Sequence, residues 1–168
     1  MLVEIIHNQH LDLRELFAQH QEALLQGNLD NAMSLLVNYN LCHVSHAKLE
    51  ERYLFPLFSK IEHDTKWDVS LYIKEHKKIE QLFTNISEAL GWLREQNLSE
   101  SQLRRNIIAL LDKEKTFKGL TEHHEEREED AMLKELDEKL KPQTIKELES
   151  DLKFTWLEVV ASIKPTNY

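Results

Sequence analysis

The chain carries one sequence pattern twice, and this duplication is its strongest constraint on a fold. Residues 9–24 read QHLDLRELFAQHQEAL, and residues 75–90 read EHKKIEQLFTNISEAL. His10 of the first copy aligns with His76 of the second. Because a repeated pattern is typical of a repeated structural unit, the duplication predicts two similar halves that face one another.

Each copy is followed by a histidine and a glutamate four residues apart. The first pair is His46 and Glu50, and the second is His124 and Glu128. Side chains at positions i and i+4 of an α-helix lie on one face. Each half therefore supplies one solitary histidine and one His/Glu pair, and two such half-sites can enclose a pair of metal ions.

The pattern lies in a sequence that reads as helix almost throughout. Among 168 residues there are only 3 Gly and 3 Pro, and apolar residues recur at helical spacing. The predicted helices span residues 3–26, 30–61, 68–96, 99–141 and, shorter, 143–163. Long helices with short connections pack antiparallel to their neighbours. We therefore expect an all-α chain: an antiparallel up-down four-helix bundle over residues 1–141, with an additional C-terminal helix in residues 142–168 packed on the bundle or on a partner.

Several helix ends can be predicted from single residues. Gly27 ends the first helix, and Asp30 is suited to cap the second. Pro56 lies inside the second predicted helix and should kink its last turns. Ser99, with Gln102 three residues later, has the spacing of a capping box and should open the fourth helix.

Counting residues from the turns tests whether the four histidines can meet. His10 lies 18 residues before a turn centred near residue 28, and His46 lies 18 residues after it. His76 and His124 differ in their distance from the second turn by only about one helical turn. Straight helices would therefore place all four histidines at similar depth.

Two inward glutamates among four imidazoles need a partner of opposite charge. A buried carboxylate without a partner is costly. A pair of cations would resolve the conflict, with glutamate oxygens bridging the ions and histidine nitrogens as terminal ligands. Imidazole and carboxylate ligands suit iron, manganese or zinc. The ferritin-like di-iron proteins use Glu-x-x-His pairs, whose order and spacing differ from those of this chain.

The string HAKLEERYLFP at residues 46–56, together with the other histidines and Glu128, resembles the hemerythrin-like, or HHE cation-binding, domain family. The resemblance covers residues 1–140. It implies a four-helix bundle that holds two iron ions with an oxo or hydroxo bridge. In this family's pattern, the bridging carboxylates would be Glu50 and Glu128, and the terminal ligands would be His10, His46, His76 and His124.

The chain departs from the oxygen-carrying members of that family at two places. They have a second histidine one turn after the ligand that matches His76, where this chain has Glu80. They end in His-x4-Asp, whereas this chain offers His124-x3-Glu128 or, in another register, His123-x4-Glu128. The pattern is thus closer to the bacterial branch, which includes iron–sulfur repair proteins and sensors. Glu80 remains a candidate ligand, and otherwise its coordination position is open or taken by water.

Other polar residues on the same helices are expected around the ligands rather than on the metal. His20 aligns with Ile86 of the second copy, so it is assigned to packing or to indirect support of the site. His43 lies one turn before a ligand and could hydrogen-bond a ligand or a bound gas. His123 is the alternative to His124. Two acids that directly follow the bridging glutamates are expected to face solvent or nearby lysines: Glu51 and Glu129.

Charge and hydropathy narrow the function classes. The net charge of −9 disfavours nucleic acid and anionic membranes as partners. No apolar run approaches the ~20 residues that span a bilayer, and the first residues lack the basic region of a signal peptide. With a single cysteine, a soluble cytoplasmic protein is expected.

Three functions fit these features. The leading hypothesis is a di-iron protein that binds a small diatomic, O₂ or NO, for sensing, storage or protection. The second is a di-iron enzyme that reduces NO or peroxide, or serves iron–sulfur repair, together with a redox partner. The third is an interaction protein whose metal is structural.

Overall fold

The computed structural model describes residues 1–163, and within this range the chain is helical with no strand. The long helices are α1 Leu2–Leu25, α2 Leu29–Leu49, α4 Val69–Arg94, α5 Glu100–Arg127 and α7 Pro142–Ser162. The shorter elements are the π-helical turns η1 Glu50–Leu54 and η2 Glu128–Met132, and the helices α3 Phe55–Phe58 and α6 Leu133–Lys139. The prediction of an all-α chain is confirmed.

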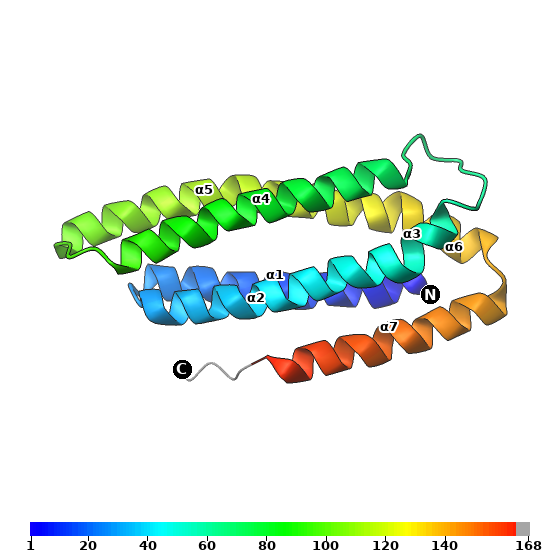
Figure 1. Ribbon diagram of the computed structural model, residues 1–168, viewed down its shortest axis with the longest axis horizontal. Helices are drawn as coiled ribbons and strands as arrows, with labels where there is room; N and C mark the ends of the chain where they lie inside the picture. Colours follow the sequence, from blue (N-terminus) through cyan, green and yellow to red (C-terminus); the bar gives the residue numbers. More distant parts are fainter. Residues whose placement is uncertain (164–168) are drawn as a thin grey trace.

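The long helices pair in the order in which they occur along the chain. Helix α1 packs along α2 and α4 packs along α5, so that two helical hairpins lie against one another (Figure 1). Between the hairpins, α1 contacts α5 and α2 contacts α4. Helix α7 lies along α1 and α2, on the side away from α4 and α5 (Figure 1).

The connections follow the turn chemistry of the sequence, with one difference. Gly27 has a φ of 71°, a left-handed conformation that favours glycine. The cap of α2 is Asn28, two residues earlier than predicted, while Asp30 lies in the first helical turn. The capping box at Ser99 is confirmed, because its hydroxyl accepts from the Gln102 N–H and the Gln102 side chain accepts from the Ser99 N–H.

Two predicted long helices change pitch at a glutamate. Helix α2 ends at Leu49 and passes into η1, where the Phe55 N–H donates to the Glu50 carbonyl. Helix α5 likewise passes into η2, where the Leu133 N–H donates to the Glu128 carbonyl. Such π-turns insert a residue into a helix and are frequent at functional sites. Both begin at the glutamate of a His/Glu pair.

An aromatic layer separates these glutamates from the end of the molecule at the α1–α2 turn. Phe17 packs against Tyr39 and Phe117, with ring centroids 5.1 Å and 5.2 Å apart. Phe83 stacks on Tyr39 at 6.1 Å. The four rings come from α1, α2, α4 and α5, so they join the two hairpins. Burial of each such side chain contributes roughly 1.5–3 kcal/mol.

Helix α7 buries one face. Leu148, Leu152 and Trp156, spaced by four residues, are buried against the rest of the molecule. No helix among residues 1–163 is long and apolar enough to cross a membrane.

Candidate metal centre

Six side chains predicted as ligands meet at the middle of the molecule. They are His10 of α1, His46 of α2, Glu50 of η1, His76 of α4, His124 of α5 and Glu128 of η2. They form two groups of four, and within each group the ligand atoms lie within 4.8 Å of one another. Both glutamates belong to both groups, and all six side chains are buried. The buried His/Glu groups could hold a metal ion.

The histidine rings point at one another through the same atom. His10 Nε2 lies 3.2 Å from His46 Nε2, and His76 Nε2 lies 3.1 Å from His124 Nε2. Metal–nitrogen bonds of about 2.1 Å place neighbouring ligand atoms roughly 3.0–3.4 Å apart. The spacing of each pair therefore suits two ligands of one ion. The equal depth expected for His10 and His46 is confirmed.

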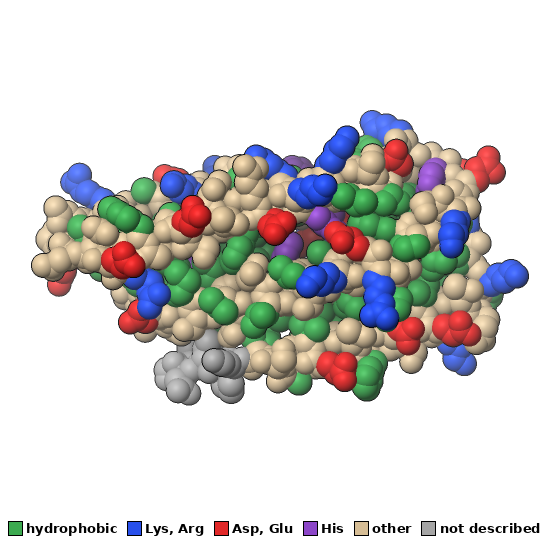
Figure 2. All heavy atoms as spheres, viewed as in Figure 1, with side chains coloured by type: hydrophobic (Ala, Val, Ile, Leu, Met, Phe, Trp, Pro, Cys, Tyr) green, Lys and Arg blue, Asp and Glu red, His purple; other side chains and the backbone are tan. Residues whose placement is uncertain are grey.

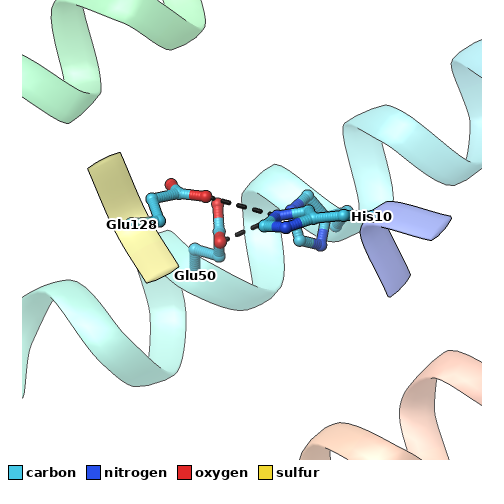
Figure 3. A group of neighbouring side chains, drawn as sticks. His10, Glu50 and Glu128 are labelled. Carbon is cyan, nitrogen blue, oxygen red and sulfur yellow. Dashed lines mark hydrogen bonds and ion pairs between the residues drawn. The ribbon is translucent and has the colours of Figure 1, made fainter. Parts of the chain in front are cut away.

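Each glutamate reaches one histidine of each half. Glu50 Oε1 lies 3.4 Å from His46 Nε2, and its Oε2 lies 3.3 Å from His76 Nε2. Glu128 Oε2 lies 3.4 Å from His10 Nε2, and its Oε1 lies 2.9 Å from the Nε2 of the histidine on α5. Figure 3 shows the carboxylates of Glu50 and Glu128 side by side, with the ring of His10 facing them.

The four carboxylate oxygens are the feature of this cluster that most needs explanation. All four are buried, and apart from the nearby imidazoles no group among residues 1–163 donates a hydrogen bond to them. Each of the four oxygens lies between 2.9 Å and 3.4 Å from the Nε2 atom of one histidine. An uncompensated buried carboxylate costs several kcal/mol, so two of them side by side call for a cation or for protons.

Glu51 and Glu129 do not face only solvent or lysines, as the sequence led us to expect. The His76 Nδ1 lies 2.9 Å from a Glu51 oxygen, and the His10 Nδ1 lies 2.7 Å from a Glu129 oxygen. When Nδ1–H donates to a carboxylate, the lone pair of Nε2 is left for a metal. Each acid directly follows a glutamate that belongs to both ligand groups, a repeat that could have revealed their shared role.

Gln9 and Glu75 are the hydrogen-bond acceptors for the Nδ1 atoms of the other two histidines. The His46 Nδ1 lies 2.9 Å from Gln9 Oε1, and the His124 Nδ1 lies 2.9 Å from Glu75 Oε2. Both acceptors directly precede the solitary histidine of their own helix. All four ligand rings are thus held from outside, but one acceptor is a neutral amide and three are carboxylates.

Burial and the neighbouring carboxylates together shift the pKa values of the rings. Burial opposes the charged imidazole of His10, yet Glu128 and Glu129 raise its pKa to about 10. At His124 burial is likewise outweighed, and Glu128 and Glu75 raise the pKa to about 10. His46, whose acceptor is an amide, has its pKa lowered by burial to about 3. The histidine rings whose Nδ1 faces a carboxylate therefore carry a proton on Nε2, and a bound metal would replace that proton.

Glu80 and His43 lie beside the cluster, not in it. Glu80 is exposed and belongs to neither group of ligand atoms. His43 is half-buried, with its ring 5.6 Å from that of Tyr39. Both line a groove between α2 and α4 that also reaches His76.

His123 and His20 lie apart from the ligands. The side chain of His123 is 77% exposed and faces Glu126 at 3.5 Å, so the structure brings His124 into the cluster in the predicted i, i+4 register. His20 is fully buried, with its ring nitrogens 2.8 Å from the Ala32 carbonyl and 2.8 Å from a Glu114 oxygen.

Comparison of the chain with protein-family models, with curated proteins and with solved structures gives no match. The chemistry of the buried cluster is therefore the basis for a functional proposal.

Proposed function

We propose that the chain is a hemerythrin-like di-iron protein that binds a small diatomic, O₂ or NO. In this proposal α1, α2, α4 and α5, with their short extensions, form an antiparallel up-down four-helix bundle over residues 1–141. Helix α7 adds a further helix to it, and residues 164–168 of the predicted C-terminal segment lie outside the described residues. Glu50 and Glu128 bridge the two ions.

The observation that carries the proposal is the sharing of two glutamates by two groups of ligand atoms. Each group offers two imidazole nitrogens and an oxygen of each glutamate. Four protein atoms for each ion leave positions for an oxo or hydroxo bridge and for an external molecule. Two cations would also neutralise buried oxygens that have no hydrogen-bond donor.

Iron is favoured over zinc by the family resemblance and not by the ligand set. The ligand set of imidazole and carboxylate, with no thiolate, suits iron and manganese as well as zinc. The resemblance of residues 46–56 to the hemerythrin-like pattern selects iron among them, and with it the diatomic ligands O₂ and NO.

Metal analysis combined with optical spectra tests the proposal. The purified chain should contain about two iron atoms, with near-UV absorption that changes on reduction and on exposure to NO. The matched control is the double variant Glu50→Gln and Glu128→Gln, which should remain helical but lack iron and this absorption. A folded wild-type chain that takes up no iron would overturn the proposal. Steady turnover of NO or peroxide with a reductant would instead favour the enzymatic alternative.

A further inference from the structure

The internal repeat makes two surfaces of the molecule equivalent, and each has a groove between the hairpins. One groove lies between α2 and α4, has a volume of about 550 Å³ and reaches His76 and Glu80. The other lies between α1 and α5, has a volume of about 230 Å³ and is lined in part by Arg14 and Glu125. Equivalent surfaces with unequal grooves must differ in their side chains.

One of the differences is an ion pair that only the α1/α5 groove contains. Arg14 donates to Glu125 Oε2 from Nε at 2.7 Å and from its terminal nitrogen at 2.6 Å. The Glu125 side chain is only 9% exposed and that of Arg14 is 44% exposed, so the pair extends from inside the groove to its surface. In the repeat, Arg14 aligns with Glu80, and Glu125 aligns with Ala47. Glu80 and Ala47 cannot form this pair, because neither is a cation.

The two approaches to the centre differ accordingly. His10, on the side of the ion pair, has a side chain only 1% exposed. His76, in the open groove, is 8% exposed and lies among Phe55, Phe83 and Ile73. Figure 2, viewed as Figure 1, shows histidine side chains at the surface between α4 and α2, flanked by charged side chains.

We propose that the Arg14–Glu125 ion pair is a plug that closes one of two equivalent approaches to the centre. Small ligands then enter through the α2/α4 groove and meet the ion held by His76 and His124. Arg14 and Glu125 bond to each other and not to a predicted ligand, so the plug acts on the route and determines which half of the centre is open. The ligand-binding part of this inference rests on the proposed function.

A change of route has a kinetic signature that a change of affinity does not have. Closing the only route slows association and dissociation by the same factor and leaves Kd unchanged, since the free and bound states are the same. A changed binding site alters Kd, mostly through the dissociation rate.

The plug is tested by exchanging side chains between equivalent positions of the two grooves. The rates of azide binding to the iron-loaded protein are then measured. The double variant Ala47→Glu and Glu80→Arg builds a plug in the open groove. It should slow azide association and dissociation together by about tenfold, with Kd changed by less than about threefold. The double variant Arg14→Glu and Glu125→Ala opens the second groove and should raise both rates.

Arg14→Glu with Glu125→Ala has a matched control at an exposed ion pair of α5. Glu100→Ala with Arg104→Glu makes the same change of net charge far from both grooves, and should leave azide kinetics unchanged. Glu125→Gln keeps the size of the side chain while weakening the pair, and serves if Glu125→Ala fails to fold. Unchanged rates in both groove exchanges, with helicity retained, would overturn the plug.

A second measurement needs neither iron nor azide. Uptake of Co²⁺ by the metal-free chain can be followed by absorption of the bound ion. Uptake should be slowest in Ala47→Glu with Glu80→Arg and fastest in Arg14→Glu with Glu125→Ala. If the wild-type iron protein shows no spectral change with NO, the ligand-binding function fails, while the order of the Co²⁺ uptake rates still decides whether the plug exists.

Discussion

The Nδ1 atom of His10, on the first helix of the chain, lies 2.7 Å from an oxygen of Glu129, a residue of η2. In a neutral His10 ring this contact keeps the proton on Nδ1, and the lone pair of Nε2 then faces Glu128 at 3.4 Å. The same relation joins His76 to Glu51. Acids that touch no metal thus orient the rings that would bind it.

Removal of this support should weaken metal binding. Glu129→Ala is expected to lower metal affinity about 10–100-fold, because the His10 ring loses its acceptor and its orientation. Glu129→Gln keeps an acceptor oxygen and should lose less. Competition with a chelator of known affinity measures both. Glu126→Ala, at an exposed acid that faces His123, is the control; an equal loss in this variant would contradict the assigned role of Glu129.

Loss of a bridging glutamate should affect metal binding more than folding. Glu50→Gln replaces one of two adjacent buried carboxyl groups by a neutral amide, so the metal-free chain should be as stable as wild type or more stable. The same variant should bind less metal and gain less thermal stability from metal than wild type does. Metal analysis and calorimetry with and without metal measure the two effects. If Glu50→Gln instead unfolds the metal-free chain, the Glu50 carboxyl group stabilises the fold without metal, which would contradict its proposed role as a metal ligand.

The metal-free chain should lose stability as pH rises, whereas the metal-loaded chain should not. The pKa of His10 and that of His124 are each raised to about 10, against burial, by carboxylates including Glu128. Groups whose pKa is raised on folding stabilise the fold fully below the unfolded value of about 6.5, and this contribution disappears as pH rises through about 10.

Urea unfolding between about pH 7 and about pH 9 should therefore show a loss of at least ~2 kcal/mol without metal. With metal bound, both rings are already unprotonated, and the stability should change little over this range. Parallel pH dependence in the two forms would show that His10 and His124 are not the groups that metal deprotonates.

The parts of the fold and site that the sequence could predict are those that depend on residue spacing within a single helix. The apolar stripes and the i, i+4 pairs follow from helical spacing, as does the choice of His124 over His123. Counting from Gly27 placed His10 opposite His46, since α1 and α2 are joined by a short turn. The duplicated pattern supplied the rest of the candidate ligand set.

The parts that the sequence could not predict depend on contacts between helices. Glu51 and Glu129 lie in π-turns, where the regular helical period no longer gives the direction of a side chain. Proline explains a kink near η1, but η2 contains none. Arg14 and Glu125 are 111 residues apart, and only packing of the hairpins brings them together.

His20 is expected to stabilise the fold without binding metal. Its Nε2 lies 2.8 Å from a Glu114 oxygen, both side chains are fully buried, and Gln21 donates to the other oxygen of Glu114. Removal of one partner from a buried pair costs about 3–5 kcal/mol, so Glu114→Ala should destabilise the chain by that amount. Metal content should remain that of wild type.

Joint replacement of the pair separates this role from a role in metal binding. His20→Leu with Glu114→Leu should recover much of the lost stability, because neither group is then left buried alone. Urea unfolding and metal analysis of the three variants give the comparison. A loss of metal in the double variant, with stability recovered, would assign His20 to the centre after all.

Trp156 should report metal binding by its fluorescence. Its indole N–H donates to Asp12 at 2.8 Å, and its ring centroid lies 6.1 Å from that of His46. A transition metal on the far side of that imidazole would be close enough to quench the indole, so metal loading should reduce tryptophan emission. Trp156→Phe should remove most of the metal-dependent change, whereas Trp92→Phe, at a side chain 56% exposed, should preserve it. The reverse outcome would mean that the metal binds elsewhere than beside His46.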